Sequence, residues 1–524
     1  MPADEVSDYD VVVVGSSASG LAGALRATER GLRVLLVEKS NVCGGTAARS
    51  GGVLWGATTD AVVAAGVPDS VDVARAYVQE LVGGATSLEL QHRVVDSLKD
   101  LFVWLEGHQV TFTHFSEYPD YRPEVDGALP RGLMPDPVDD DFLAALPHGV
   151  APKLEGGAGP TLSIPGKTIS GGRALIARLL AACTAAGVEV WTESPMLELA
   201  IDQDRITGIK VSRNGRTIEI AAPSGVLLAS GGFDHNPALR ERYSKGGAAD
   251  WSLGAPGNTG DALQAGLAAG AATALMEEAW WAPAVLYPDG SPRFLLFDVL
   301  APVGILADRN GERWCDEGTP YNDLGHLWVD AAETGKPVVP CWFVFDQRAL
   351  ETYGACGLRP DASQDEWLES GALLKSESME GLAKELDAPA LPESVRRWNH
   401  LAETGHDEDF GRGKPGSFAQ LASAVYTRFP GVARPHPWPN PCLAPLAEGP
   451  FYAMKVVLSD LGTKGGLACD VEGRVTRLDG SVVEGLYACG GAMAAPMGRA
   501  YPGPGAPITP AIVFAVSAAD DMAG

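Results

Sequence analysis

The stretch YDVVVVGSSASG occupies residues 9–20, and RVLLVEK follows at residues 33–39. A short continuous apolar run is typical of a buried strand, and the glycine and serine turn after it leads into an Ala- and Leu-rich helical pattern. Gly31 ends this predicted helix, and residues 33–37 form a second apolar strand. The pattern predicts a βαβ unit of the length used for nucleotide binding, and therefore a Rossmann-like α/β fold.

The turn in this unit carries residues that suit a dinucleotide. Gly15 permits the tight turn, and Gly20 allows the helix to pack closely on the strand. The helix N-terminus, with Ser16 and Ser19 beside it, attracts a pyrophosphate. Glu38, at the end of the next strand, can accept hydrogen bonds from both ribose hydroxyl groups. Ser17 replaces the middle glycine of the usual fingerprint, so this turn alone is a weak signal.

Further glycine segments point to a flavin. Paired glycines with small hydroxyl residues let the main chain lie against a flavin ring and donate amide hydrogen bonds. No histidine lies beside them, so we expect FAD bound noncovalently. The predicted FAD-binding residues, besides those of the first turn, are Lys39, Gly44, Gly45, Thr46, Ser50, Gly51, Gly52, Gly231, Gly232, Asp261, Gly490, Gly491 and Ile508.

The length of 524 residues predicts two domains. Between about residues 282 and 440 the content of Trp, Pro and acidic residues rises, and Gly/Ala/Val-rich sequence returns afterwards. We therefore expect a Rossmann-like FAD-binding domain built from both chain ends (1–281 and 441–524). An α+β catalytic domain (282–440) is expected as an insertion. Residues 198–211 and 217–222 are expected to pair as a hairpin around Asn214-Gly215, and residues 338–344 to form a strand of the insertion.

Charge and composition exclude several classes of partner. The formal charge of −27 would repel nucleic acid and anionic membrane surfaces. The first ten residues lack a basic signal region, and no apolar stretch reaches the ~20 residues of a spanning helix, so we expect a cytoplasmic protein without stable membrane insertion. The eight cysteines show neither a C-x-x-C pair nor a cluster with histidine, which indicates no metal site.

Three longer motifs carry a family resemblance. They are GRAYPGPGA at residues 498–506, RWCDEGTPY at 313–321 and YPDYRPE at 118–124. With residues 10–52, 170–261 and 448–522, they resemble the 3-ketosteroid Δ1-dehydrogenases of the fumarate reductase and succinate dehydrogenase flavoprotein superfamily. The resemblance implies an FAD-dependent enzyme that desaturates a cyclic ketone between its α and β carbons.

The resemblance also implies the roles of the site residues. The Tyr501 hydroxyl and the Gly505 amide would polarise the ketone oxygen, Tyr321 would take the α proton, and Tyr121 would activate Tyr321. Acting as a tyrosinate would require a lowered pKa of Tyr321 relative to a model value of about 10. Tyr118 and Phe297 would line the substrate cavity.

Other functions stay open at this point. Smaller cyclic ketones, such as cyclohexanone-type substrates, are served by similar enzymes with the same tyrosines. A flavin reductase of the fumarate or urocanate kind would use arginine as proton donor and carboxylate ligand, whereas the terminal segment offers Tyr501 and Gly505. A flavin-binding scaffold without catalysis would have no need of the tyrosines. The reoxidising partner is expected to be an external electron acceptor, a quinone or similar.

Overall fold

Strand β2 (Val11–Val14) lies inside a six-stranded sheet in the computed structural model, which describes residues 4–6, 9–116, 118–152, 168–359, 361–428 and 437–524. Its neighbours are β3 (Val34–Val37), followed by β11 (Glu189–Trp191), and on the other side β15 (Gly225–Leu228), followed by β25 (Val482–Ala488) and β24 (Arg474–Thr476). All pairs are parallel except β24 with β25. Strands from the two chain ends thus share one Rossmann-like sheet, as predicted.

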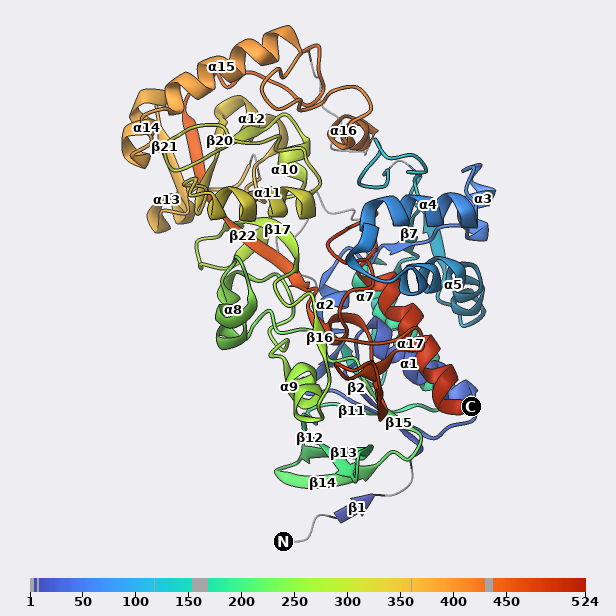
Figure 1. Cartoon of the computed structure of the whole chain (residues 1–524). Coiled ribbons are helices and arrows are strands. Elements are labelled where there is room, and N and C mark those ends of the chain that lie inside the picture. The colour runs from blue at the N-terminus through green and yellow to red at the C-terminus, as the bar shows by residue number, and fades with distance from the viewer. Residues whose placement is uncertain (1–3, 7–8, 117, 153–167, 360, 429–436) are drawn as a thin grey trace.

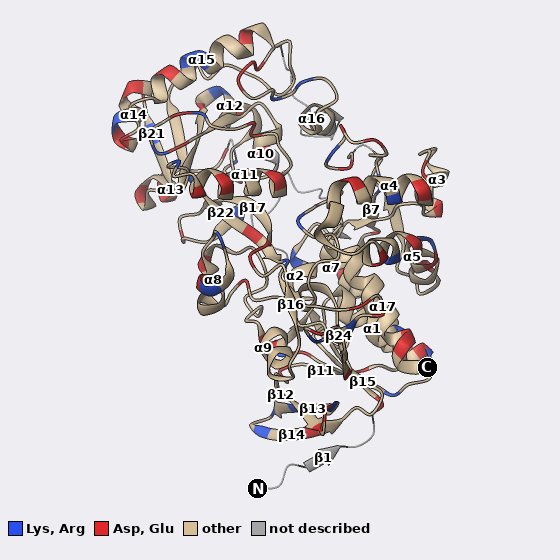
Figure 2. Cartoon of the chain, in the orientation of Figure 1, with Lys and Arg blue, Asp and Glu red and all other residues tan. Residues whose placement is uncertain are grey.

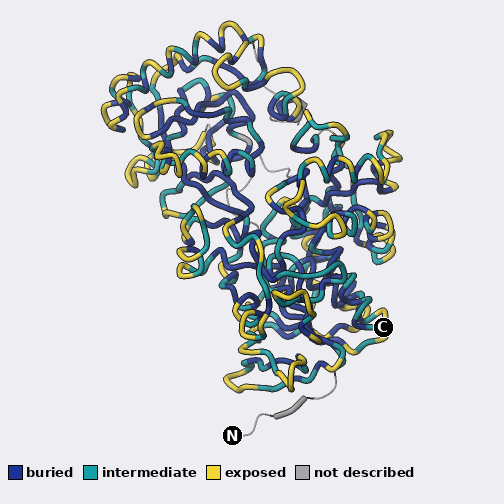
Figure 3. The backbone as a smooth tube through the Cα atoms, viewed as in Figure 1, coloured by how far each residue is buried: buried dark blue, intermediate teal, exposed yellow. Residues whose placement is uncertain are grey.

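Three helices cover this sheet on one side (Figure 1). Helix α1 (Ala18–Glu29) follows β2 directly and packs against α7 (Gly172–Ala186) and α17 (Ile508–Ala523). Arg26 of α1 forms an ion pair of 2.7 Å with Asp520 of α17. The helices and strands of this part share one buried core (Figure 3).

An antiparallel sheet of β12 (Met196–Asp202), β13 (Arg205–Arg213) and β14 (Arg216–Ala221) contacts β15 and β25, and β1 (Asp4–Val6) pairs with β14. Asn214 and Gly215 form the turn between β13 and β14, with φ of 50° and 74°, which confirms the predicted hairpin turn. The expectation of one strand over residues 198–211 is wrong. The polar turn around Gln203, whose φ is 51°, divides it into β12 and β13.

A second, antiparallel sheet forms the upper part of Figure 1. Its order is β18 (Pro292–Phe294), β17 (Ala279–Leu286), β22 (Phe451–Thr463), β20 (Cys341–Asp346) and β19 (Gly304–Ala307), and β21 (Leu373–Ser376) also pairs with β22. Strand β20 begins three residues after the predicted start, because Pro340 has no amide hydrogen for the ladder. Acidic and basic residues are spread over the helices around this sheet (Figure 2).

Strand β22 belongs to a different sheet from the one expected for its part of the sequence. Its residues fall in the segment expected to return to the FAD-binding domain, yet they pair with β17, β20 and β21. Its apolar character, which prompted the assignment, arises because it is a central strand with both faces buried. We therefore propose that the second boundary lies near residue 464 rather than 441.

The other elements complete the two parts. The short strands are β4 (Val42–Cys43), β5 (Leu54–Trp55), β6 (Phe112–His114), β7 (Gly132–Pro135), β8 (Val138–Asp139), β9 (Gly149–Val150), β10 (Thr168–Ile169), β16 (Thr273–Ala274) and β23 (Gly466–Leu467). The helices are α2 (Gly45–Arg49), α3 (Asp60–Ala64), α4 (Val71–Val82), α5 (Leu88–Gly107), α6 (Asp140–Ala144), α8 (Pro237–Tyr243), α9 (Asp261–Ala268), α10 (Phe297–Leu300), α11 (Tyr321–Glu333), α12 (Gln347–Tyr353), α13 (Asp365–Ser370), α14 (Met379–Leu386), α15 (Leu391–Thr404) and α16 (Phe418–Arg428).

The close approach of α1 to β2 gives a stability prediction. A Cβ at position 20 would lie 2.0 Å from the Gly15 carbonyl oxygen, so Gly20→Ala forces the helix away from the strand. We expect a loss of about 1–3 kcal/mol in the free energy of unfolding, measured by chemical denaturation. Gly107→Ala is the matched control, since nothing lies within 4 Å of its added Cβ. Equal stability of the two variants would contradict the packing argument.

Candidate active site

The turn between β2 and α1 is built for a close backbone approach. Gly15 has φ of +104°, and a Cβ there would lie 2.6 Å from the Ala229 carbonyl oxygen. Ser17, which replaces the expected glycine, is the N-cap of α1 and accepts a hydrogen bond from the Gly20 amide at 3.4 Å. The serine therefore stabilises the helix start that faces the cavity.

Glu38 is held in place by two serines. Its Oε2 accepts hydrogen bonds from the Ser16 amide (3.1 Å) and Ser16 Oγ (2.6 Å). Its Oε1 accepts from the Ser40 amide (2.8 Å) and Ser40 Oγ (2.9 Å). Each oxygen has a further lone pair, so the carboxylate is oriented at the cavity wall and can still accept a ligand hydroxyl.

Lys39 and Asp261 were predicted separately and meet in the structure. Lys39 Nζ lies 2.7 Å from Asp261 Oδ2 and 2.8 Å from Thr259 Oγ1. Both residues line the same cavity as the first turn. The ion pair joins the end of β3 to the start of α9, which fixes the segment after Gly257 beside the turn.

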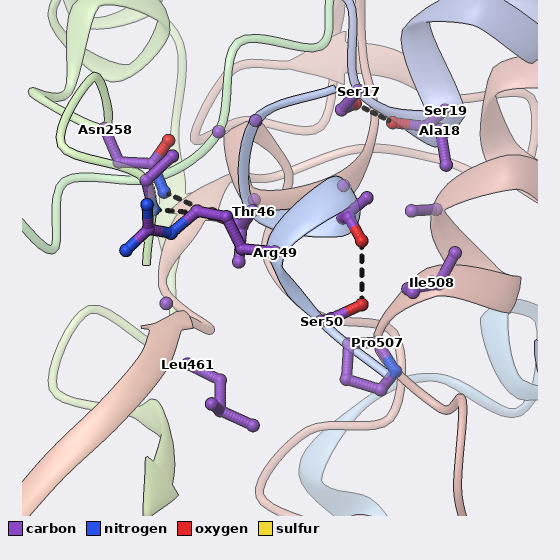
Figure 4. Close-up of a pocket in the computed structure, with 18 of the residues that line it drawn as sticks. Ser17, Ala18, Ser19, Thr46, Arg49, Ser50, Asn258, Leu461, Pro507 and Ile508 are labelled. Carbon is purple, nitrogen blue, oxygen red and sulfur yellow. Dashed lines mark hydrogen bonds between the residues drawn. The ribbon is translucent and has the colours of Figure 1, made fainter. Parts of the chain in front are cut away.

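One cavity of about 640 Å³ runs from the first turn to the tyrosines. Figure 4 shows part of its wall, where Ser17, Ser19, Ser50 and Ile508 are labelled. Of the predicted FAD-binding residues, those that line it are Gly15, Ser16, Ser19, Glu38, Lys39, Gly45, Thr46, Ser50, Gly51, Gly52, Gly231, Gly232, Asp261, Gly490, Gly491 and Ile508.

Gly20 and Gly44 are not part of this lining. Gly20 packs on Gly15, and Gly44 donates its amide to Ser16 Oγ at 3.2 Å. A Cβ at Gly44 would lie 2.6 Å from the Ala48 side chain, and its φ is +116°. The sequence prediction counted both among the FAD-binding residues. The close packing of helix on strand that it predicted for Gly20 is present, whereas Gly44 supports the wall instead of lining it.

The wall fits a dinucleotide. The N-terminus of α1 opens onto the cavity through residues 15–19. The amides of Gly15 and Ser16 donate to Val37 and Glu38, whereas those of residues 17–19 have no acceptor among the described residues, which suits a diphosphate. The buried Ser230 Oγ lines the cavity and lacks a hydrogen-bond partner among the described residues. A Cβ at Gly232 would lie 2.0 Å from Thr463 Oγ1, so the chain passes there with no room for a side chain.

Three tyrosines from distant parts of the chain meet at the far end of this cavity. The hydroxyl groups of Tyr121 and Tyr321 lie 3.2 Å apart. The ring of Tyr501 lies 4.9 Å from that of Tyr121 and 5.3 Å from that of Tyr321, measured between centroids. All three line the cavity together with Gly505, and all are buried. The structure thus brings the four predicted catalytic residues together.

The terminal loop (residues 498–506) holds the last two of these residues. Gly505 has φ of +97°, and a Cβ there would lie 2.3 Å from the Trp55 amide nitrogen. No hydrogen bond from the Gly505 amide is found within the described part of the chain. The Pro502 carbonyl accepts hydrogen bonds from the Tyr121 amide (2.9 Å) and the Tyr77 hydroxyl (2.7 Å).

The electrostatics of Tyr321 correct one expectation. Burial raises its pKa well above the usual range, and the nearby Tyr121 and Tyr501 raise it further. The lowered pKa expected from the sequence is therefore not produced by these side chains. The physical reason is that Tyr321 is packed against aromatic rings, including that of Phe294 with ring centroids 5.0 Å apart, and such rings cannot solvate a phenolate.

The two predicted substrate residues differ in outcome. Tyr118 lines the cavity and stacks on Phe115 with centroids 5.3 Å apart. Phe297 begins α10, and its side chain lies outside the described part of the structure. Phe294, Leu296 and Trp280, which the sequence prediction missed, do line the cavity.

Two further features of the wall were also missed. Arg49 lines the cavity at the end of α2, beside the glycine pair, and its Nε is buried without a partner among the described residues (Figure 4). Asp234 is buried next to Asp460, and Ser252 Oγ donates to both carboxylates at 3.2 and 2.8 Å. Burial and the neighbouring Asp460 raise the pKa of Asp234 to about 7. Asp234 and Asp460 lie 226 residues apart, so only the fold could reveal this pair.

Comparison with known proteins agrees with this geometry. A family model described as "FAD binding domain" matches residues 10–508. A 3-oxosteroid 1-dehydrogenase from Mycolicibacterium smegmatis is 36% identical over 98% of this chain and 97% of its own. The chain belongs to the 3-oxosteroid 1-dehydrogenase family of FAD-binding proteins. Its cofactor is FAD.

Two further members of this family are informative. A 4-oxocyclohexanecarboxylate 2-dehydrogenase from Sinomonas cyclohexanicum is 34% identical, with 99% of this chain and 93% of that one covered. The crystal structure of a 3-ketosteroid Δ1-dehydrogenase from Sterolibacterium denitrificans, in complex with 1,4-androstadiene-3,17-dione, superposes with a TM-score of 0.88 at 32% identity, covering 99% of each chain. Family members of similar sequence therefore differ in the ring system that they are named for.

Two further observations concern membranes and metals. Within the described ranges, none of the helices combines the length and apolar character needed to cross a bilayer. The same residues contain no group of three His, Cys, Asp or Glu side chains placed to hold a metal ion.

Glu38 gives a test of the FAD site. Glu38→Ala removes a charged acceptor placed for the ribose hydroxyls, so we expect FAD to bind about 10- to 100-fold more weakly. The measurement is FAD titration of the apoprotein, followed by flavin fluorescence. Glu241→Ala, at an exposed position of α8, is the control. Unchanged FAD affinity of Glu38→Ala would exclude the ribose role.

Proposed function

We propose that this protein removes two hydrogens from a 3-ketosteroid, one from each of the carbons α and β to the ketone, with FAD as the oxidant. The observation that carries the proposal is the convergence of Tyr121, Tyr321 and Tyr501 on the cavity that the predicted FAD-binding residues also line, with the first two hydroxyls 3.2 Å apart. Dehydrogenation beside a ketone needs an acid at the carbonyl oxygen, a base at the α carbon and a hydride acceptor at the β carbon.

The carbonyl oxygen would accept hydrogen bonds from Tyr501 and Gly505. Both line the cavity, and the Gly505 amide has no partner within the described residues. Two donors aimed at one oxygen stabilise the enolate charge that develops when the α proton leaves. Arg499 of the same loop serves neither role, because its Nε is paired with Glu278 at 2.8 Å.

Tyr321 would take the α proton. Its raised pKa makes its phenolate scarce but strongly basic, which suits a weakly acidic carbon. The Tyr121 hydroxyl lies 3.2 Å from the Tyr321 oxygen, and either can be the donor. While the neutral Tyr321 donates to Tyr121, the contact keeps its pKa raised; once Tyr321 has lost its proton, Tyr121 becomes the donor and stabilises the phenolate. The buried aromatic surroundings exclude water that would otherwise protonate the base.

FAD, when bound, supplies the hydride acceptor for the β carbon. We infer that it is held noncovalently, since the described lining of the cavity contains no histidine or cysteine nucleophile. The reoxidising partner is proposed to be an external acceptor, a quinone or similar.

A steroid is favoured over the alternatives by the wall and by the relatives. Phe115, Trp280, Phe294, Leu296 and Leu461 make the tyrosine end of the cavity apolar, which suits a fused hydrocarbon ring system. The relative with 36% identity and the superposed structure are both named for 3-oxosteroids. A reductase of the fumarate or urocanate type is less well supported, because the terminal loop presents a tyrosine and an amide to the cavity.

The proposed roles predict different defects for two tyrosine variants. Tyr321→Phe removes the base and should slow flavin bleaching by a 3-ketosteroid about 10²- to 10⁴-fold in an anaerobic single turnover. Tyr501→Phe removes one of two donors, so it should slow bleaching about 10²- to 10³-fold and also weaken binding of the ketone product. Tyr452→Phe, a buried tyrosine of the second sheet, is the control. Normal bleaching by Tyr321→Phe would leave Tyr121 as the base.

A second candidate substrate is a cyclic ketone that also carries a carboxylate. Arg49 lines the cavity with a buried, unpartnered Nε, and Arg293 lies close enough to lower its pKa further by repulsion after burial. Among the described residues neither arginine forms an ion pair with a carboxylate, so Arg49 in the cavity wall, with Arg293 nearby, can bind a substrate anion. One relative at 34% identity is named for 4-oxocyclohexanecarboxylate.

Arg49→Met separates the two candidates. The ratio of kcat/KM for a 3-ketosteroid with a side-chain carboxylate to that for its neutral methyl ester should fall about tenfold or more, because one charged hydrogen bond is lost. Arg396→Met, at an exposed position of α15, should leave the ratio unchanged. If Arg49→Met also leaves the ratio unchanged, Arg49 does not bind the carboxylate of the substrate.

A further inference from the structure

Lys464 is a buried cation to which the proposed reaction assigns no role. It follows β22 directly and is 1% exposed. Its Nζ donates to the Arg499 carbonyl at 2.5 Å and lies 3.4 Å from the Ala500 carbonyl. These are the two peptide carbonyls immediately before Tyr501. The ammonium group also lies 4.4 Å from the centroid of the Trp280 ring, whose edge packs on Tyr501 at 5.1 Å.

A second donor reaches the same carbonyl from the opposite element. Asn322 Nδ2 donates to the Arg499 carbonyl at 3.1 Å, and Asn322 directly follows Tyr321 in α11. One carbonyl oxygen therefore joins three segments: the end of β22, the start of α11 and the terminal loop. The main chain at Tyr321 is therefore connected to the main chain at Tyr501 through the Arg499 carbonyl.

The charges around Lys464 show that its burial is costly. Burial lowers its pKa to about 7, while Glu278 and Asp323 favour the charged form and Arg499 opposes it. Glu278 is itself shared with Arg499 at 2.8 Å and His326 at 2.8 Å. An apolar side chain of similar length would fill the space without this desolvation penalty. The lysine is therefore poorly explained as packing.

We propose that Lys464 is a positioning residue for the dehydrogenation: by holding the Arg499 and Ala500 carbonyls, it fixes the Tyr501 hydroxyl relative to Tyr321. The proposal rests on the function proposed above. Its energetic basis is the protonated form of the lysine, which Glu278 and Asp323 favour: a charge-assisted hydrogen bond is about twice as strong as a neutral one, so it can restrain a loop that is rich in proline and glycine. Misplacing a reacting group by about 1 Å can cost on the order of 10² in rate.

The first test compares the holoenzyme with its Lys464→Met and Lys464→Arg variants. Lys464→Met removes the donor and keeps the apolar stem, so the protein should retain FAD and its melting temperature. Its rate of anaerobic flavin bleaching by a 3-ketosteroid should fall about 10- to 100-fold, mainly in kcat rather than KM. Lys464→Arg should recover most of this loss, since it restores the charged donor. A Met variant as active as the parent would overturn the proposal.

A double-mutant cycle shows through which residue Lys464 acts. If the lysine works by placing Tyr501, then Lys464→Met should cost less than about threefold in a Tyr501→Phe background, because the placed hydroxyl is already absent. Losses that simply multiply would mean that Lys464 affects the rate by another route, and would overturn the proposal.

Two further measurements cover failure of folding and of the proposed function. If Lys464→Met loses FAD, Asn322→Ala tests the same carbonyl from α11, and it should show the same dependence on Tyr501. If no ketone bleaches the parent enzyme, the proposed function has failed. A crystal structure of Lys464→Met then decides the positioning role separately: an unmoved Tyr501 hydroxyl contradicts it, and a displaced one supports it.

Discussion

The peptide carbonyls of the terminal loop are the constraint on which the site depends. The Pro502 carbonyl binds the amide of Tyr121, and the Arg499 carbonyl binds Lys464 and Asn322. Each element that carries a proposed catalytic tyrosine is thus bonded to the loop through main chain or an adjacent side chain. A hydrogen bond to a backbone carbonyl places the backbone and leaves the tyrosine hydroxyls available for chemistry. This arrangement explains how three residues up to 380 positions apart come to share one cavity.

A buried ion network supports Tyr121 from behind. Arg131 lies 2.7 Å from Asp69 and 2.6 Å from Asp120, and all three side chains are fully buried. Asp120, which precedes Tyr121, also accepts from the Trp55 indole at 2.9 Å. Burial raises the pKa of Asp120 to about 6 against the opposing effect of Arg131, so the network is expensive to assemble. The network fixes the geometry of the Tyr121 segment. Any conformation that separates Asp120 from Arg131 would leave an unpaired buried charge, so the segment is held in a single conformation.

Local patterns predicted the parts of the molecule that local interactions decide. The apolar strand before Gly15 and the turn at Asn214-Gly215 were both predicted from the sequence, because strand burial and turn geometry depend on neighbouring residues. The motif resemblance predicted that Tyr121, Tyr321 and Tyr501 belong to one site, and in the structure all three line one cavity. The residues of β22 were expected in the FAD-binding domain, whereas the structure pairs them with β17, β20 and β21, because an apolar strand does not specify its partner. Lys464 carried no signal, since its role depends on a carbonyl 35 residues away.

The electrostatics of the tyrosine cluster set a limit on how the chemistry can work. The pKa of Tyr321 is raised by burial and by Tyr121 and Tyr501, so its neutral form dominates near neutral pH. A scarce but strong base is effective only if each ionised molecule meets a substrate that is already aligned, because proton transfer needs hydrogen-bond distance. Precise placement must therefore compensate for the small phenolate population. The density of bonds to the terminal loop, including one from a lysine that is costly to bury, follows from this requirement.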